Sequence, residues 1–166
     1  MRRLIIALTA LFVMSYVQAA QVDTVLVNSR SMQKDIKTVV IIPDVAAEKP
    51  CPVIYLLHGH GNDYSGWMRV KPNLPQIADE KGIIFICPDG ERSWYWDSPL
   101  NKHVRYETFI SSELIAYVDS HYKTIARREG RAITGLSMGG HGAMWNAIRH
   151  SDVFGAAGST SGGVDI

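Results

Sequence analysis

The sequence predicts an α/β fold in which a mostly parallel sheet begins with an antiparallel hairpin. Two segments near the N-terminus alternate apolar and polar residues, as strands with one solvated face do. Two later segments are continuous apolar runs, which is typical of strands buried on both faces of a parallel sheet. Segments with apolar residues at helical spacing separate and follow these runs, so strands and helices alternate along the chain.

The individual elements follow from these patterns. The hairpin is expected first, then a polar connector between two prolines, and then three parallel strands with helices between and after them. Gly82 is a stop signal for the first of these helices. In chain order, we expect strands at 22–27 and 36–42, a connector at 43–52, a strand at 53–57, a helix around 74–78, a strand at 83–86, a helix at 106–122, a strand at 132–134, a helix at 139–149 and a further strand from 154.

Composition indicates one ordinary globular domain. The chain has 166 residues, 46% hydrophobic and 20% charged, without repeats or low-complexity segments. The formal net charge is +1, and two positive charges, Arg2 and Arg3, lie in an expected leader, so the mature chain would carry 1 − 2 = −1. A nearly neutral chain offers no electrostatic footprint for nucleic acid or an anionic membrane.

Residues 1–19 are predicted to be a signal peptide, and 20–166 the functional domain. Arg2 and Arg3 form a basic start, Leu4 to Val17 is uncharged and apolar, and Val17-Gln18-Ala19 places small residues where a signal peptidase reads them. The alternative is a permanent membrane anchor, but the apolar part is short for a spanning helix, which needs about 20 residues. We therefore expect a periplasmic or secreted protein without a stable anchor.

The two cysteines are expected to be free. Cys51 precedes one apolar strand, and Cys87 ends the next. If the two strands are parallel neighbours, five residues at about 3.3 Å each place the thiols at opposite ends of the sheet. A disulfide needs Cα atoms within about 7 Å.

Gly135-Leu136-Ser137-Met138-Gly139 is the main catalytic candidate, a sharp strand-to-helix turn of the kind called a nucleophile elbow. This Gly-x-Ser-x-Gly motif lies between a short apolar strand and a helix, where the turn is so sharp that the residues two before and two after the serine must be glycine. Ser137 would be strained and lifted off the sheet edge at a helix N-terminus, as a nucleophile requires. The alternative is a glycine-rich turn without chemistry.

The loop His58-Gly59-His60-Gly61-Asn62-Asp63 follows the first apolar strand. Acyl transfer needs two donors aimed at the developing oxyanion. We expect the backbone amide of Met138 to be one and an amide near His60 to be the second. A His-x-His-x-Asp-His zinc site would need Asp and His where Asn62 and Asp63 stand, so no metal is expected.

Trp94 and Trp96 lie in the long loop after the second parallel strand, on the side where open α/β sheets bind ligands. They could stack on a sugar or phenolic ring, or they could simply pack the loop. His141, four residues past Ser137, is expected to be a packed or capping histidine rather than the base. Residues Gly158 to Gly162 have the same glycine spacing as the serine motif, but Thr160 stands at the centre. We expect these small residues only to end a strand beside the active site.

Three motifs in this order resemble the putative-esterase family of the α/β-hydrolases: Tyr55-Leu56-Leu57-His58-Gly59, Cys87-Pro88-Asp89-Gly90, and Thr134 to Ala143 around the serine. That family contains esterase D-like S-formylglutathione hydrolases, feruloyl and acetyl esterases, and mycolyltransferases. The resemblance implies an α/β-hydrolase sheet, Ser137 as nucleophile, and the amides of His60 and Met138 as oxyanion hole. It covers about residues 22–166, the N-terminal part of such a fold.

The chain departs from that fold after Ser137. The triad of α/β-hydrolases runs serine, acid, histidine in chain order, but the first acid after Ser137 is Asp152 and the last histidine is His150. Two further strand–helix units, of about 30 residues each, would normally follow. We therefore expect a fragment or a truncated product, with the C-terminal strands and helices missing and feeble activity at best.

The predicted function is an exported carboxylic ester hydrolase that forms an acyl-enzyme. Its substrate would be a small-molecule or carbohydrate-linked ester, and it would need neither metal nor other cofactor. A downstream histidine would act as base and then acid, oriented by a downstream Asp or Glu. The alternatives are an acyltransferase of the same family and a non-catalytic carbohydrate-binding relative.

Overall fold

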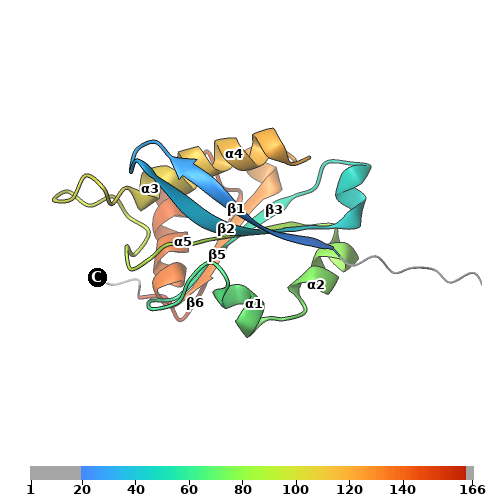
Figure 1. The fold of residues 1–166 in the computed structure, drawn as a ribbon, viewed down its shortest axis with the longest axis horizontal. Helices are drawn as coiled ribbons and strands as arrows, with labels where there is room; N and C mark the ends of the chain where they lie inside the picture. Colours follow the sequence, from blue (N-terminus) through green and yellow to red (C-terminus); the bar gives the residue numbers. More distant parts are fainter. Residues whose placement is uncertain (1–19, 164–166) are drawn as a thin grey trace, which may run out of the picture.

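The computed structural model describes residues 20–163, and the predicted signal peptide lies outside this range (Figure 1). Its centre is a six-stranded mixed sheet with the strand order β1-β2-β4-β3-β5-β6. The strands are β1 (Gln21–Ser29), β2 (Lys34–Ile42), β3 (Val53–Leu57), β4 (Ile84–Pro88), β5 (Arg131–Leu136) and β6 (Ala156–Thr160). The helices are η1 (Asp44–Ala47), α1 (Gly66–Val70), α2 (Leu74–Lys81), α3 (Tyr106–Thr108), η2 (Phe109–Glu113), α4 (Leu114–His121), η3 (Arg128–Gly130) and α5 (Met138–Arg149).

The predicted hairpin is confirmed. β1 and β2 pair antiparallel over their whole length, from Gln21 opposite Ile42 to Ser29 opposite Lys34. β2 then pairs antiparallel with β4, which joins the hairpin to the parallel part of the sheet. The sheet is therefore mostly parallel with an antiparallel edge, as the sequence predicts.

The continuous apolar runs form the parallel centre of the sheet because both faces are covered. Ile84 and Ile86 of β4 point into one apolar cluster, and Phe85 and Cys87 point into another on the opposite face. In Figure 1, α4 and α5 lie on one side of the sheet, and α1 and α2 lie on the other. Leu74 of α2 belongs to the second cluster. Since successive side chains alternate between faces, two covered faces require an unbroken apolar run.

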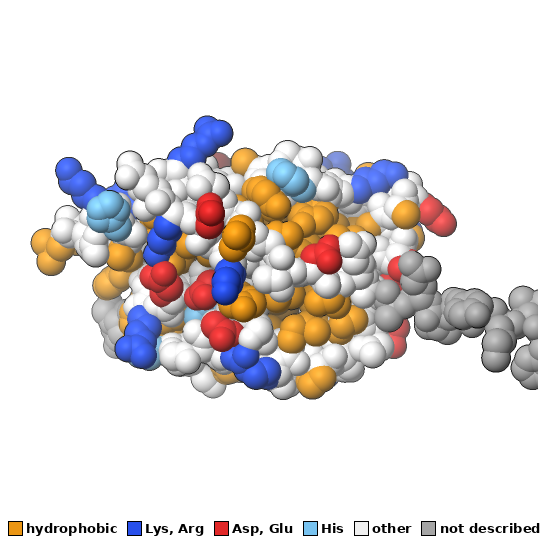
Figure 2. Space-filling view, in the orientation of Figure 1, with side chains coloured by type: hydrophobic (Ala, Val, Ile, Leu, Met, Phe, Trp, Pro, Cys, Tyr) orange, Lys and Arg blue, Asp and Glu red, His pale blue; other side chains and the backbone are white. Residues whose placement is uncertain are grey.

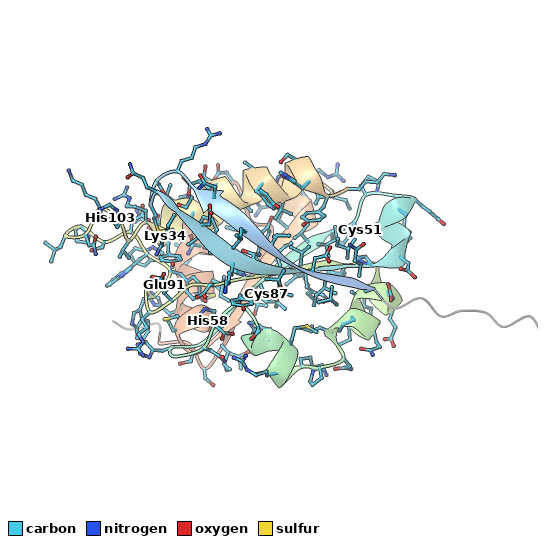
Figure 3. The ribbon with its side chains drawn as sticks, viewed as in Figure 1. Lys34, Cys51, His58, Cys87, Glu91 and His103 are labelled. Carbon is cyan, nitrogen blue, oxygen red and sulfur yellow. The ribbon has the colours of Figure 1, made fainter. Side chains whose placement is uncertain are left out.

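The expectation for the cysteines is confirmed. β3 and β4 are parallel neighbours, with Val53 opposite Ile84. Cys51 precedes β3, while Cys87 lies near the far end of β4, and both thiols are buried and free. Figure 3 shows the two residues well apart along the sheet.

The helix expected at 106–122 contains a feature that periodicity does not reveal. α3, η2 and α4 follow one another without a break, and η2 is a π-helical turn. Glu113, at the end of this turn, accepts hydrogen bonds from the Ser29 hydroxyl at 2.6 Å and the Ser31 amide at 2.8 Å. The π-turn thus coincides with the attachment of the β1–β2 hairpin to the helix.

The remaining helices and the last strand agree with the sequence in outline. α2 ends at Lys81, and the next residue, Gly82, caps it in a left-handed conformation (φ 64°) that matches the predicted stop. The short helix α1 was not predicted. β6 begins two residues later than expected because Phe154 turns into the core instead. β6 is an edge strand of the described sheet, and most of its residues are exposed.

The surface agrees with the balanced composition. On the face seen in Figure 2, acidic and basic side chains are interspersed, without a broad area of one sign. Across residues 20–163, no helix is both long enough and apolar enough to span a bilayer.

Candidate active site

Ser137 lies in the turn between β5 and α5. Its backbone adopts φ 54° and ψ −118°, a conformation that L-residues rarely adopt, and its side chain is exposed. The Ser137 amide donates to the carbonyl of Thr160 at the end of β6 (2.9 Å), and its carbonyl accepts from the His141 amide (3.0 Å). Strand β6 and helix α5 therefore hold this strained residue from both sides.

Two glycines make the turn possible. A Cβ atom on Gly135 would lie 2.2 Å from the carbonyl oxygen of Gly139. A Cβ atom on Gly139 would lie 2.1 Å from the carbonyl oxygen of Leu57. Neither position has room for a side chain, which is the crowding expected on both sides of an elbow serine.

The loop after β3 packs directly against this elbow. A Cβ atom on Gly59 would lie 3.5 Å from Cβ of Ser137 and 3.3 Å from the carbonyl oxygen of Leu136. His60 follows and is exposed, whereas Met138 is fully buried as the first residue of α5. The structure thus brings together the two segments from which the sequence predicts the oxyanion donors.

His58 holds the shape of this loop. Its buried imidazole accepts the Gly90 amide at Nε2 (2.8 Å), so Nδ1 carries the proton and donates to the Gly59 carbonyl (2.9 Å). Nε2 also lies 3.5 Å from the carboxylate of Asp89. The Asp89 carboxylate also accepts a hydrogen bond from the Glu91 amide at 2.8 Å.

Tyr95 connects this loop to helix α5, a role that the sequence does not indicate. Its fully buried side chain donates a hydrogen bond from its hydroxyl to the His58 carbonyl at 3.1 Å. Its own carbonyl accepts from the Asn146 side chain on α5 at 3.0 Å. The ring fills space that exists only because residues 90 and 142 are glycines, where added Cβ atoms would come within 2.2 and 2.5 Å of it. The only sequence signal was membership of an aromatic cluster.

Trp94 and Trp96 both contact His141, one turn beyond Ser137 on α5. The His141 ring lies 5.5 Å from that of Trp94 and 6.3 Å from that of Trp96, and it stacks on Trp145 at 5.9 Å. The two tryptophans that could stack on a sugar or phenolic ring therefore lie beside helix α5. Trp96 is 39% exposed, so part of its ring is open to a ligand.

The prediction that His141 is a packed histidine is confirmed. It is buried, and its Nδ1 lies 2.8 Å from the carbonyl oxygen of Gly163. Its Nε2 has no hydrogen-bond partner among residues 20–163. Within the same range, no hydrogen bond joins the imidazole to the Ser137 hydroxyl.

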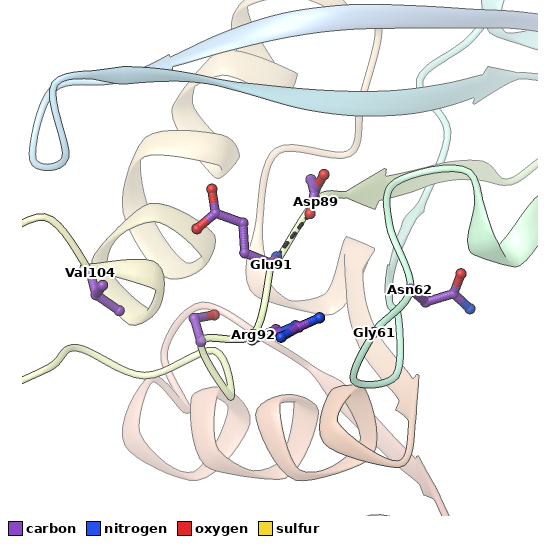
Figure 4. A pocket seen from close by; sticks show the side chains of 7 residues that line it. Gly61, Asn62, Asp89, Glu91, Arg92 and Val104 are labelled. Atoms are coloured by element: carbon purple, nitrogen blue, oxygen red, sulfur yellow. Dashed lines mark hydrogen bonds between the residues drawn. The ribbon is translucent and has the colours of Figure 1, made fainter.

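A cavity of about 550 Å³ opens beside the loop after β3 (Figure 4). It runs between that loop and the segment after β4, and Gly61, the residue after His60, belongs to its wall. Most of the residues that line it are polar or charged, and both signs of charge are present: Gly61, Asn62, Asp89, Glu91, Arg92, Ser93 and Val104.

The structure explains two further motifs, the end of the zinc-like loop at Asn62 and Asp63 and the glycine-spaced segment from Gly158 to Gly162. Asn62 and Asp63 both bind the guanidinium of Arg69 on α1. A hydrogen bond from the Ser65 side chain lowers the pKa of Asp63, and the positive charge of Arg69 lowers it further. At the glycine-spaced segment, a Cβ atom on Gly140 would lie 2.7 Å from the Ser159 hydroxyl, so the small residues there reflect close packing on α5.

An elbow serine that faces a glycine-containing loop across a mostly parallel sheet defines the chain as an α/β-hydrolase-type protein. The family model described as "Putative esterase" matches residues 29–166, and the chain belongs to this family. It is 32% identical over 128 residues to an esterase of Mycobacterium tuberculosis (strain ATCC 25618 / H37Rv), covering 74% of this chain and 28% of the esterase.

Two further relatives broaden the comparison. A diacylglycerol acyltransferase/mycolyltransferase of Mycobacterium leprae (strain TN) is 35% identical over 154 residues, covering 87% of this chain and 44% of that protein. The solved structure of a ferulic acid esterase is 32% identical with a TM-score of 0.72, covering 83% of this chain and 58% of the other. The chain thus spans between about a quarter and three fifths of these relatives.

Proposed function

We propose that this chain carries the nucleophile and oxyanion hole of an exported carboxylic ester hydrolase. The observation that carries the proposal is the conformation of Ser137, which is exposed and strained at a turn where neither Gly135 nor Gly139 could bear a side chain. Backbone strain of this kind costs about 1–3 kcal/mol and persists where the surroundings enforce it. Membership of an esterase family supports the assignment to ester chemistry.

In the proposed reaction, Oγ of Ser137 attacks the ester carbonyl carbon while a base removes the hydroxyl proton. The negative charge that develops on the carbonyl oxygen is stabilised by the amides of Met138 and His60. The alcohol leaves with the proton, and the acyl group stays on Ser137. Water then attacks the acyl-enzyme, which releases the carboxylic acid and restores the serine.

The base and its acidic partner are proposed to come from sequence beyond Ile166. None of the histidines in residues 20–163 is hydrogen-bonded to Ser137, and no acid and histidine follow it in the order that the fold uses. The short span of the chain relative to its relatives supports the same proposal. The 166 residues alone are therefore expected to be a feeble esterase.

Trp94 and Trp96 are proposed as one wall of the substrate site, and the cavity of about 550 Å³, which has both acidic and basic residues in its lining, lies next to the loop of His60. Water is the proposed acyl acceptor. The similarity to an acyltransferase/mycolyltransferase favours a second candidate, in which an alcohol replaces water in the same site. Residues 1–19 are proposed to direct export to the periplasm or the medium.

The test compares this 166-residue chain with the product of the complete open reading frame, each also as Ser137→Ala. Fluorophosphonate labelling and hydrolysis of p-nitrophenyl acetate are expected in the complete product only, and both should disappear with Ser137→Ala. Labelling that survives the substitution would contradict the assignment of the nucleophile. Full turnover by the short chain would contradict the need for a downstream base.

A further inference from the structure

Ala20 is anchored before β1 begins. Its side chain is only 5% exposed and lies in the apolar cluster on the α2 side of the sheet. Its backbone nitrogen lies 2.6 Å from Oδ2 of Asp79, a residue of α2 that is 59 positions away along the chain. Figure 1 shows the start of β1 close to α2. The nitrogen of Ala20 is therefore held by burial on one side and by a carboxylate on the other.

The same carboxylate also binds the other strand of the hairpin. Oδ1 of Asp79 accepts the amide of Asp44, which lies two residues after the end of β2. Asp79 thus links the start of β1 and the exit of β2 to one helix. An amide nitrogen, however, supplies one hydrogen and no formal charge, which is a modest partner for a partly buried carboxylate.

We propose that Asp79 is the binding site for the N-terminal ammonium group that forms when the peptide bond between Ala19 and Ala20 is hydrolysed. This inference rests on the export proposed above. Water adds across the bond, so Ala19 leaves with a new carboxylate and Ala20 keeps its nitrogen, which takes up a proton at neutral pH. The hydrogen bond that Asp79 already accepts becomes a charge-assisted ion pair.

The geometry makes the site specific for one cleavage position. Consecutive Cα atoms are about 3.8 Å apart, so an ammonium group one residue earlier or later would lie several ångströms from Oδ2. β1 cannot slide to compensate, because Gln21 is already paired with Ile42 and a shift of one residue would turn every side chain to the opposite face. Only a chain that begins at Ala20 places its charge beside Asp79.

The first experiment determines the N-terminus. The product of the complete open reading frame is expressed in an exporting host, and its intact mass is measured. A mature chain that begins at Ala20 is expected. A chain that begins at Met1 would overturn both the export and this inference, and one that begins at any other residue would overturn this inference alone.

The second experiment measures the ion pair in a double-mutant cycle. Mature protein that begins at Ala20 is compared with protein that carries one additional glycine, which restores an amide at Ala20 and moves the charge. Both are prepared with Asp79 and with Asp79→Asn. The additional glycine should lower the melting temperature by about 2–4 °C. In Asp79→Asn, the glycine should have no effect.

The control is Glu80→Gln, which removes a negative charge from the next, exposed residue of α2. There the glycine should still lower the melting temperature. An equal effect of the glycine with Asp79 and with Asn at this position would overturn the inference. Fluorophosphonate labelling of the same variants reports on Ser137 independently, so failure of the ion pair and failure of the proposed esterase function are distinguishable.

Discussion

The hydroxyl of Tyr95 donates a hydrogen bond to the backbone carbonyl of His58, 3.1 Å away, and both groups are buried. The two residues are 37 positions apart in the sequence. His58 begins the loop that approaches Ser137, so this bond helps to determine the direction of the amides in that loop.

Tyr95→Phe should therefore reduce catalysis more than binding. Loss of one buried hydrogen bond costs about 1 kcal/mol, which corresponds to a roughly fivefold lower kcat if the donor geometry is disturbed. The matched control is Tyr106→Phe, because the buried hydroxyl of Tyr106 has no partner among the described residues. Steady-state kinetics of the complete protein test the prediction. An equal kcat for both variants would contradict a positioning role for Tyr95.

Trp96→Ala should change selectivity, because this ring is partly exposed beside the elbow helix. Stacking between aromatic rings contributes about 0.5–1.5 kcal/mol, so activity on an aryl ester should fall by roughly 2- to 10-fold more than activity on a small acetyl ester. The ratio of kcat/KM for the two substrates is the readout. Equal losses on both substrates, together with a lower Tm, would favour packing as the role of Trp96.

Ser137→Gly should stabilise the protein while it abolishes the proposed activity. Relief of a strained conformation contributes about 1–3 kcal/mol, and the greater chain entropy of glycine offsets about 0.5–1 kcal/mol of this. A net gain of about 1 kcal/mol is expected from urea denaturation. Ser137→Ala is the control, because alanine keeps the strained backbone (φ 54°). Its free energy of unfolding should stay near that of the wild type. Equal stability of the two variants would show that the turn is not strained.

Glu107 should contribute to stability in a pH-dependent way. Its buried carboxylate accepts hydrogen bonds from Trp145 at 2.8 Å, Arg149 at 2.7 Å and His150 at 3.0 Å. Burial would raise the pKa of Glu107, but the bonds from Arg149 and Trp145 outweigh it and hold the pKa below its ordinary value. Glu107→Gln is therefore expected to lower the free energy of unfolding by about 1–3 kcal/mol at neutral pH.

The sign of the pH effect follows from the lowered pKa. The contribution of Glu107 is complete above the ordinary glutamate pKa of about 4.3 and is lost as the pH falls through the lower pKa of the folded state. Urea denaturation should therefore show that the difference in the free energy of unfolding between wild type and Glu107→Gln becomes smaller from pH 5 to pH 3. The exposed Glu129→Gln is the control and should show little difference at any pH. If the difference in the free energy of unfolding between wild type and Glu107→Gln grew toward pH 3, the lowered pKa of Glu107 would be contradicted.

Cys87 should be unreactive in the folded protein. Burial raises the pKa of its thiol to about 12, so almost no thiolate exists at pH 8. Denatured, unreduced protein should contain two reactive thiols, because Cys51 and Cys87 are both free. Thiol counting before and after denaturation tests this. A denatured count of zero would contradict the strand order.

The elements that could be predicted from the sequence are those with a local signal. Alternation identified the hairpin, unbroken apolar runs identified β3 and β4, and the glycines around Ser137 identified the elbow, because each pattern reflects the geometry of a few consecutive residues. The same strand assignments placed the two cysteines apart. The π-turn of η2 has no distinct periodicity and was not foreseen.

Only the tertiary structure decided how these elements are joined. The hydrogen bonds of Tyr95 to His58 and of Ala20 to Asp79 connect residues 37 and 59 positions apart, and the tautomer of His58 depends on Gly90, 32 positions away. Such contacts depend on which strands become neighbours and which helix covers which face. No local pattern carries that information, since a buried tyrosine or aspartate looks the same in the sequence whichever partner it meets.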